Sequence, residues 1–288
     1  MQDICCKPAI KRKTDDPASI AFIKNLRFNT LAMKFQGLGS VIKRSCLIVL
    51  ILFLQIANSA AQNLRVATAA NLQSVIGALQ ADFKKKTGIT IEPIIGSSGK
   101  LVAQMKNGAP FDIFLSADMN FPDALYQAGL TTKQPVVYAY GNLIICSTQN
   151  IGFVNWQRVL LTPAIKKIVM ANPDVAPYGA AAKEVLQKED VLGNIKSKLV
   201  VGESISQVNT YITTGVVDVG FTTQALISDP ANKTKLYWTA IDPKTYTPIQ
   251  QGMVILKRAE NNAGALKFYR YLLSADAKVI FEKYGYRL

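Results

Sequence analysis

The sequence predicts an α/β protein with mainly parallel sheets flanked by helices. From Gln62 onward, short runs rich in β-branched residues alternate with segments whose apolar residues recur at helical spacing. The chain has 288 residues, of which 49% are hydrophobic and 18% charged. This composition is that of an ordinary globular protein with one or two hydrophobic cores.

The expected strands are short apolar segments separated by turn residues and helical stretches. They are Arg65–Thr68, Ile89–Ile95, Phe111–Ser116, Val136–Ser147, Lys167–Met170, Lys198–Val201, Val217–Phe221 and Met253–Leu256. We expect the chain to cross between two lobes near Tyr140–Asn142 and again between Asp242 and Pro248.

Four expected helices each follow a strand. Asn71 is the expected N-cap of the first helix, whose apolar residues continue to Phe83 and which ends at Gly88. The others begin at Ser98, after Pro177-Tyr178-Gly179, and after Ser204. In open α/β sheets, ligands bind at the carboxyl ends of strands, where such junctions gather.

The N-terminal segment has the pattern of a signal peptide. Lys43-Arg44 precede the apolar run Cys46–Ile56, and small residues follow it up to Ala61. The run is short for a membrane span, which favours a cleaved signal over an uncleaved anchor. We therefore expect translation to start at Met33, cleavage to follow Ala61, residues 1–32 to be an upstream extension, and the mature protein to be periplasmic.

Composition excludes several classes of site. The chain has no histidine, so a Ser-His-Asp triad, a Cys-His pair and a histidine-liganded metal site are excluded. After cleavage only Cys146 remains, so no internal disulfide forms. The formal charge is +14, but the basic residues are scattered without an aromatic stripe, which argues against nucleic-acid binding and is compatible with attracting an anion.

The stretch Ser97-Ser-Gly-Lys100 allows three interpretations. It matches the S-x-x-K of serine acyl-transfer enzymes, but the other motifs of that class are absent or misplaced. It lacks the spacing of a nucleotide-binding loop. The two serines could simply cap a helix. Because three other helix starts follow strands in the same way, we favour a shared anion site built from helix N-termini.

The ordered motifs of the chain resemble the periplasmic molybdate-binding proteins of ABC importers, from about Leu64 to Leu288. These motifs are Thr68-Ala-Ala-Asn71, Gly96-Ser-Ser-Gly-Lys-Leu101, Gly108-Ala-Pro-Phe-Asp-Ile-Phe-Leu-Ser-Ala-Asp118, Ala171-Asn-Pro-Asp-Val-Ala-Pro-Tyr-Gly-Ala-Ala182 with Lys183-Glu184, and Phe281-Glu-Lys-Tyr-Gly285.

The fold implied by this resemblance is the two-lobed type II periplasmic binding protein fold, with a ligand cleft between lobes that close by hinge motion. The expected boundaries place residues 62–141 and 246–288 in lobe I and residues 142–245 in lobe II.

The resemblance also implies the residues that contact the ligand. An amide side chain is expected from Asn71, with Ala70 beside it as a backbone donor, and a hydroxyl from Ser98. Tyr178 and Ile205 are expected to contribute backbone groups. Ser97 is a further candidate, and so is Thr223, which stands where many relatives use a tyrosine hydroxyl and has a shorter reach that Tyr178 could compensate.

The function implied is capture of molybdate, and of tungstate, by a monomeric binding protein that delivers the anion to a membrane ABC permease. No cofactor, direct metal ligand or catalytic residue is expected. Lys100 is expected at the rim, Asp112 in the structure of the lobe, and Asp118 as the cap of the following turn. Two alternatives stay open, namely another tetrahedral oxyanion such as sulfate, and a serine acyl hydrolase using Ser98 and Lys100.

Overall fold

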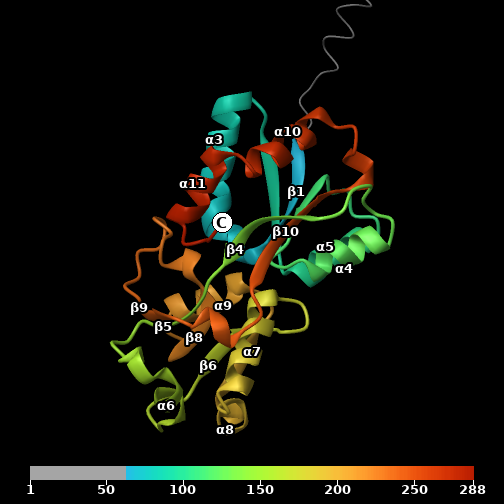
Figure 1. Ribbon diagram of the computed structural model, residues 1–288. Coiled ribbons are helices and arrows are strands. Elements are labelled where there is room, and N and C mark those ends of the chain that lie inside the picture. The colour runs from blue at the N-terminus through green and yellow to red at the C-terminus, as the bar shows by residue number, and fades with distance from the viewer. Residues whose placement is uncertain (1–62) are drawn as a thin grey trace, which may run out of the picture. The chain divides into compact units, whose positions relative to one another are not determined.

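Two five-stranded sheets organise residues 63–288, the part of the chain that the computed structural model describes (Figure 1). The predicted start at Met33 and the predicted cleavage after Ala61 lie outside the described residues. Within residues 63–288, no helix is long and apolar enough to cross a membrane.

The first sheet has the strand order β2-β1-β3-β10-β4. Its strands are β1 (Leu64–Ala69), β2 (Ile91–Gly96), β3 (Ile113–Leu115), β4 (Val136–Gly141) and β10 (Ile249–Ile255). Strands β1, β2 and β3 pair in parallel, whereas β10 runs antiparallel to both of its neighbours.

Helices cover both faces of the first sheet. Successive residues of a strand point to opposite faces, so strands that are apolar throughout need a packing partner on each side. On β1, Val66 belongs to one hydrophobic cluster and Ala67 to another on the other face. One face packs against α3 (Gln73–Thr87), α10 (Ala263–Leu272) and α11 (Ala275–Lys283), and the other against α4 (Ser98–Lys106) and α5 (Asn120–Gln127).

The second sheet has the order β7-β6-β8-β5-β9. Its strands are β5 (Leu143–Ser147), β6 (Ile168–Ala171), β7 (Leu199–Gly202), β8 (Val219–Thr223) and β9 (Tyr237–Ala240). The helices associated with it are α6 (Trp156–Leu161), α7 (Pro177–Lys188), α8 (Leu192–Ile195) and α9 (Ile205–Thr213), and a single hydrophobic cluster joins them to the sheet.

The α/β class is confirmed, but the sheets are parallel only in part. In the second sheet, β6 pairs in parallel with β7 and β8, whereas β5 is antiparallel to β8 and β9. The long strand expected at Val136–Ser147 is two strands, β4 and β5, which belong to different sheets and are separated by Asn142. A chain that passes from one sheet into the other and back enters each sheet without a helical crossover, so these strands need not be parallel.

Four strands, two in each sheet, are each followed by the start of a helix. Strand β1 leads into the short 3₁₀ turn η1 (Ala70–Leu72) and then α3, and β2 leads into α4. In the second sheet, β6 is followed by α7 and β7 by α9. All four are carboxyl ends of parallel strands, so the fold gathers four helix N-termini from two sheets.

Candidate functional site

A small cavity of about 10 Å³ lies where these four helix starts meet. The five main residues predicted from the sequence, together with Ser97, all line it. The lining residues are Ala69, Ala70, Asn71, Ser97, Ser98, Ala117, Ala176, Pro177, Tyr178 and Ile205. The remaining candidate, Thr223, is buried but does not line the cavity.

Main-chain donors surround this cavity because of where the helices begin. Ser98 and Ile205 are the first residues of α4 and α9, Asn71 lies in η1, and Tyr178 is the second residue of α7. The first N–H groups of a helix have no acceptor within that helix, and the helix dipole gives its N-terminus a partial positive charge. The cavity therefore offers donors from four separate segments.

Two hydroxyl groups add to these donors. Ser98 Oγ accepts a hydrogen bond from the Ala117 N–H at 3.1 Å, so its own proton is left to donate. Ser97 Oγ is buried and has no protein partner among the described residues. Ser97 occupies the N-cap position of α4, but its side chain makes no capping bond. The capping interpretation of the two serines therefore does not fit.

Asn71 differs from the expectation that it caps the first helix. The N-cap of η1 is Ala69 and that of α3 is Leu72, whereas Asn71 lies inside η1 and is 2% exposed. Its Nδ2 donates to Gln251 Oε1 at 2.8 Å and to Tyr286 Oη at 3.2 Å. Its Oδ1 is buried without a hydrogen-bond partner among the described residues. The amide is held by tertiary contacts rather than by the helix end.

Behind the cavity, tyrosine and threonine hydroxyls form a second set of contacts. Thr223 Oγ1 donates to Tyr178 Oη at 3.2 Å, and Tyr286 Oη donates to the Asn71 carbonyl oxygen at 2.8 Å. Burial raises the pKa of Tyr178 well above its ordinary value, and burial likewise raises the pKa of Tyr286. Both hydroxyls therefore stay protonated. Thr223 supports the Tyr178 side chain instead of replacing it.

Full charges stay outside the cavity, whose lining includes no lysine, arginine, aspartate or glutamate. Lys100 Nζ pairs with Glu203 Oε1 at 2.5 Å, with side chains 49% and 70% exposed. Asp112 Oδ2 accepts from the Arg65 N–H at 2.8 Å, and Asp118 Oδ1 accepts from the Phe121 N–H at 3.2 Å. These contacts fit the expected roles of Lys100, Asp112 and Asp118.

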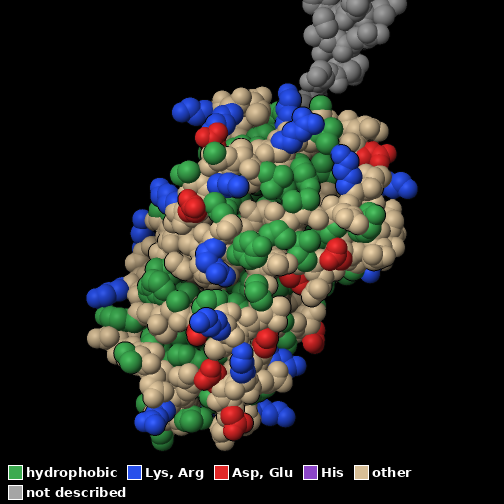
Figure 2. All heavy atoms as spheres, in the orientation of Figure 1, with side chains coloured by type: hydrophobic (Ala, Val, Ile, Leu, Met, Phe, Trp, Pro, Cys, Tyr) green, Lys and Arg blue, Asp and Glu red, His purple; other side chains and the backbone are tan. Residues whose placement is uncertain are grey.

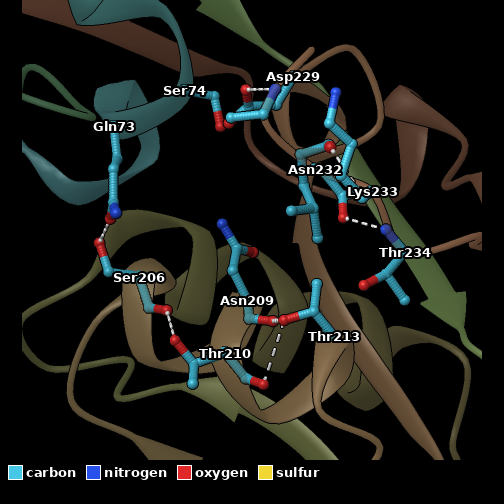
Figure 3. A pocket seen from close by; sticks show the side chains of 12 residues that line it. Gln73, Ser74, Ser206, Asn209, Thr210, Thr213, Asp229, Asn232, Lys233 and Thr234 are labelled. Carbon is cyan, nitrogen blue, oxygen red and sulfur yellow. Dashed lines mark hydrogen bonds between the residues drawn. The ribbon is translucent and has the colours of Figure 1, made fainter.

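Several contacts beside the cavity join elements of the two sheets. The Gly99 N–H donates to the Val175 carbonyl oxygen at 3.0 Å. A Cβ on Gly99 would lie 3.0 Å from Val175 Cα, so any larger residue would press against this main chain. Ser206 of α9 donates to Gln73 of α3. Figure 3 shows this last bond at the edge of a neighbouring polar hollow of about 330 Å³.

The face of residues 63–288 shown in Figure 2 has no patch of one sign of charge. On the face shown in Figure 2, Lys and Arg side chains are spread among Asp and Glu side chains and do not gather at one place. Within residues 63–288, no group of histidine, cysteine, aspartate and glutamate residues could hold a metal ion.

Gln251 is the main residue near the site that sequence reasoning missed. It lies on β10, is 0% exposed, and contacts Asn71 across 180 positions of the chain. The pair Gln250-Gln251 in the strand Ile249–Ile255 was the available signal, because neighbouring strand residues face opposite sides, so one amide is buried and needs partners.

The groups that line the cavity are suited to an anion. N–H and O–H donors around an uncharged cavity stabilise negative charge without a counter-ion. The two residues of the hydrolase alternative make other contacts here, since Ser98 Oγ accepts from a main-chain N–H and Lys100 pairs with Glu203.

Comparisons with known proteins agree with this geometry. Residues 64–287 match the model of a family described as bacterial extracellular solute-binding proteins. The molybdate-binding protein ModA of Azotobacter vinelandii is 35% identical over 230 residues, covering 79% of this chain and 91% of the relative. ModA of Rhodobacter capsulatus is 34% identical over 229 residues, with 79% and 89% covered.

The solved structure of the Azotobacter vinelandii periplasmic molybdate-binding protein superposes with a TM-score of 0.74 at 31% identity. The superposition covers 78% of this chain and 99% of that one. This similarity confirms the expected type II binding-protein fold.

Proposed function

The chain belongs to the bacterial extracellular solute-binding protein family, and from this premise we propose that it captures molybdate, and also tungstate, for delivery to a membrane ABC permease. The single observation that supports the ligand most is the small cavity at which four helix starts and two serine hydroxyls meet without a charged side chain. The relatives named molybdate-binding proteins support the same ligand.

The proposed contacts are donated by both sheets. Ser98 contributes its hydroxyl and main chain, and Asn71, Tyr178 and Ile205 contribute from the other three helix starts, with Ala70 and Ser97 beside them. A tetrahedral dianion has four oxygens that each accept hydrogen bonds, so donors converging from four directions match its shape. Charge-assisted bonds of this kind hold the anion without a lysine or arginine.

We further propose that residues 62–141 with 246–288 and residues 142–245 act as two lobes that close over the anion. The hydrogen bond from Gly99 to Val175 and the Lys100–Glu203 pair each join one lobe to the other. The ligand residues come from both lobes, so the anion and these contacts favour the same closed arrangement.

Export belongs to the same proposal. A signal segment ending at Ala61 would place the mature, monomeric protein in the periplasm, where it meets its permease. N-terminal sequencing of protein recovered from the periplasm tests this point: a first residue near Gln62 is expected, and a chain that keeps residues 33–61 contradicts cleavage.

The ligand is tested by thermal unfolding of the purified protein with molybdate, tungstate, sulfate and phosphate. A ligand that binds only the folded state raises the midpoint in proportion to its affinity. Molybdate and tungstate should raise it most. An equal or larger shift with sulfate would favour that oxyanion. A stoichiometric adduct of Ser98 with an acyl reagent would instead favour the serine hydrolase.

A further inference from the structure

We propose that Gln251 is a positioning residue for the bound oxyanion, because its buried amide sets which atom of the Asn71 amide is free to face the anion. This inference rests on the proposed function, since it assigns Gln251 a role toward the anion in the cavity. Gln251 itself does not line the cavity.

The Asn71 amide offers the cavity no free donor as it stands. Both protons of Nδ2 are engaged, one with Gln251 Oε1 at 2.8 Å and one with Tyr286 Oη at 3.2 Å. The atom left without a partner is Oδ1, which is buried and accepts hydrogen bonds only. An unpartnered buried oxygen beside an anion is unfavourable on two counts, since it is unsatisfied and it repels negative charge.

A bound anion requires a hydrogen-bond donor from the Asn71 amide, where the structure now presents an acceptor. Rotation of its amide by half a turn exchanges the oxygen and the nitrogen without changing the shape of the side chain. The nitrogen then becomes available to donate to the anion. The oxygen, however, would come to the present position of Nδ2, 2.8 Å from Gln251 Oε1. Two acceptors that close repel, so Asn71 rotates only if Gln251 rotates with it.

The contacts of Gln251 permit this second rotation. Its Nε2 now donates to the carbonyl oxygens of Ala117 at 3.4 Å and Ile249 at 3.5 Å, which are long and weak bonds. After rotation, Nε2 donates to Asn71 Oδ1 at the short distance that Oε1 now holds. The rotation gives up these two long bonds and the bond from Asn71 Nδ2 to Tyr286 Oη, so Tyr286 must turn its proton from the Asn71 carbonyl oxygen to Oδ1. In exchange, the partner of Asn71 at Gln251 changes from acceptor to donor.

Tyr178 satisfies the other end of the rotated Gln251 amide. Its hydroxyl accepts from Thr223 Oγ1 at 3.2 Å, so its own proton is free to donate to Oε1. Gly141 leaves the room for this contact, because a Cβ there would collide with Tyr178 Oη and would lie 2.8 Å from Gln251 Nε2. The donors then run in one direction from Thr223 through Tyr178, Gln251 and Asn71 to the anion.

A double-mutant cycle tests whether Gln251 acts through Asn71. Calorimetric titration with molybdate compares the wild-type protein, Gln251→Met, Asn71→Ala and the double variant. Each single substitution is expected to weaken binding about ten- to a hundred-fold, the range of one charge-assisted hydrogen bond. The double variant is expected to bind about as weakly as Asn71→Ala alone, since the contact being oriented is already gone.

Gln80 provides the matched control. It lies on α3 with its Nε2 donating to the Ile91 carbonyl oxygen at 2.8 Å, away from the cavity. Gln80→Met removes the same chemical group and should leave molybdate affinity unchanged. If the losses from Gln251→Met and Asn71→Ala multiply in the double variant, Gln251 has only a structural role and the inference is overturned.

Nuclear magnetic resonance observes the side-chain amide groups directly. It distinguishes a failure of the proposed role of Gln251 from a failure of molybdate binding. Molybdate should shift the side-chain N–H signals of both Asn71 and Gln251 and leave those of Gln80 in place, with each signal assigned by its loss in the variant. An unmoved Gln251 signal at saturation overturns the relay while binding stands. A wild-type protein that shows no binding of molybdate overturns the proposed function and this inference with it.

Discussion

At the scale of single residues, Ser98 and Lys100 are close in sequence but make different contacts. Ser98 lines the cavity and has a hydroxyl proton to donate, whereas Lys100 pairs with Glu203 at the surface. Ser98→Ala should cost about 1.5–3 kcal/mol, or about ten- to a hundred-fold in molybdate affinity. Lys100→Ala should cost much less, because a half-exposed ion pair contributes little.

Calorimetry on both variants, with folding checked by circular dichroism, measures the difference. A loss with Lys100→Ala as large as that with Ser98→Ala would show that the anion needs a basic residue. A hydrolase predicts a third pattern, in which both substitutions abolish turnover of an acyl substrate.

Gly99 is expected to affect closure rather than ligand contact. A Cβ at Gly99 would lie 3.0 Å from Val175 Cα and from Phe121 Cζ, and the first of these is main chain that yields little. Gly99→Ala should therefore weaken molybdate binding several-fold, mainly through faster dissociation. Stopped-flow kinetics measures this rate.

Gly77 is the matched control, because a Cβ there meets no atom within 4 Å. Gly77→Ala in α3 should leave the dissociation rate unchanged and raise stability by about 0.5–1 kcal/mol. An unchanged dissociation rate in Gly99→Ala would mean that the approach to Val175 does not limit opening.

The cavity residues were found from sequence because each lies at a local junction of strand and helix. Ser98, Tyr178 and Ile205 needed only the order of elements and a family resemblance. The position of Asn71 was also found, but its contacts with Gln251 and Tyr286 were not, since they join residues 180 and 215 positions apart. Such pairings depend on tertiary structure, which local patterns do not record.

At the scale of elements, strands and helices lie where the sequence predicted them, except that the strand expected at Val136–Ser147 is two strands and α7 begins at Pro177 rather than after Gly179. The pairing of the strands could not be predicted from the sequence. Whether a strand pairs in parallel depends on the path of the chain, so the antiparallel positions of β5 and β10 were not foreseen. Strand β9 was missed as well. Its residues Tyr237–Ala240 alternate between half-buried and exposed, and they carry a weak apolar signal.

If helix N-termini supply the donors, the affinity for molybdate should not depend on pH. Main-chain N–H groups and serine hydroxyls do not titrate between pH 6 and 9, and the chain has no histidine. Burial raises the pKa of Tyr178 and of Tyr286, so both keep their protons throughout this range. Molybdate affinity measured by calorimetry should therefore vary less than about three-fold between pH 6 and 9.

A ten-fold change in affinity over that range would mean that a titrating group contacts the anion. Asp118 is the nearest acidic residue in sequence to the lining residue Ala117, and burial raises the pKa of its carboxyl. Asp118→Asn would then remove the pH dependence, whereas it should do nothing if the donors are those proposed here.

At the scale of the whole molecule, the residues proposed to contact the anion lie at helix starts that follow strands of both sheets, so we expect binding to be coupled to the arrangement of the two sheets. The contacts Gly99–Val175 and Ser206–Gln73 join elements of the two sheets beside the cavity. Small-angle scattering should show a smaller radius of gyration with molybdate than without it. A radius that stays the same at saturation would contradict closure around the anion.

The central claim is that an uncharged cradle of helix N-termini selects the oxyanion by size and donor arrangement. Competition calorimetry tests it most directly, with molybdate titrated into the purified protein in the absence and in the presence of excess sulfate. We expect one site per chain and a molybdate affinity that sulfate barely reduces. A molybdate affinity that falls strongly in excess sulfate, or a protein that binds neither anion, would contradict it.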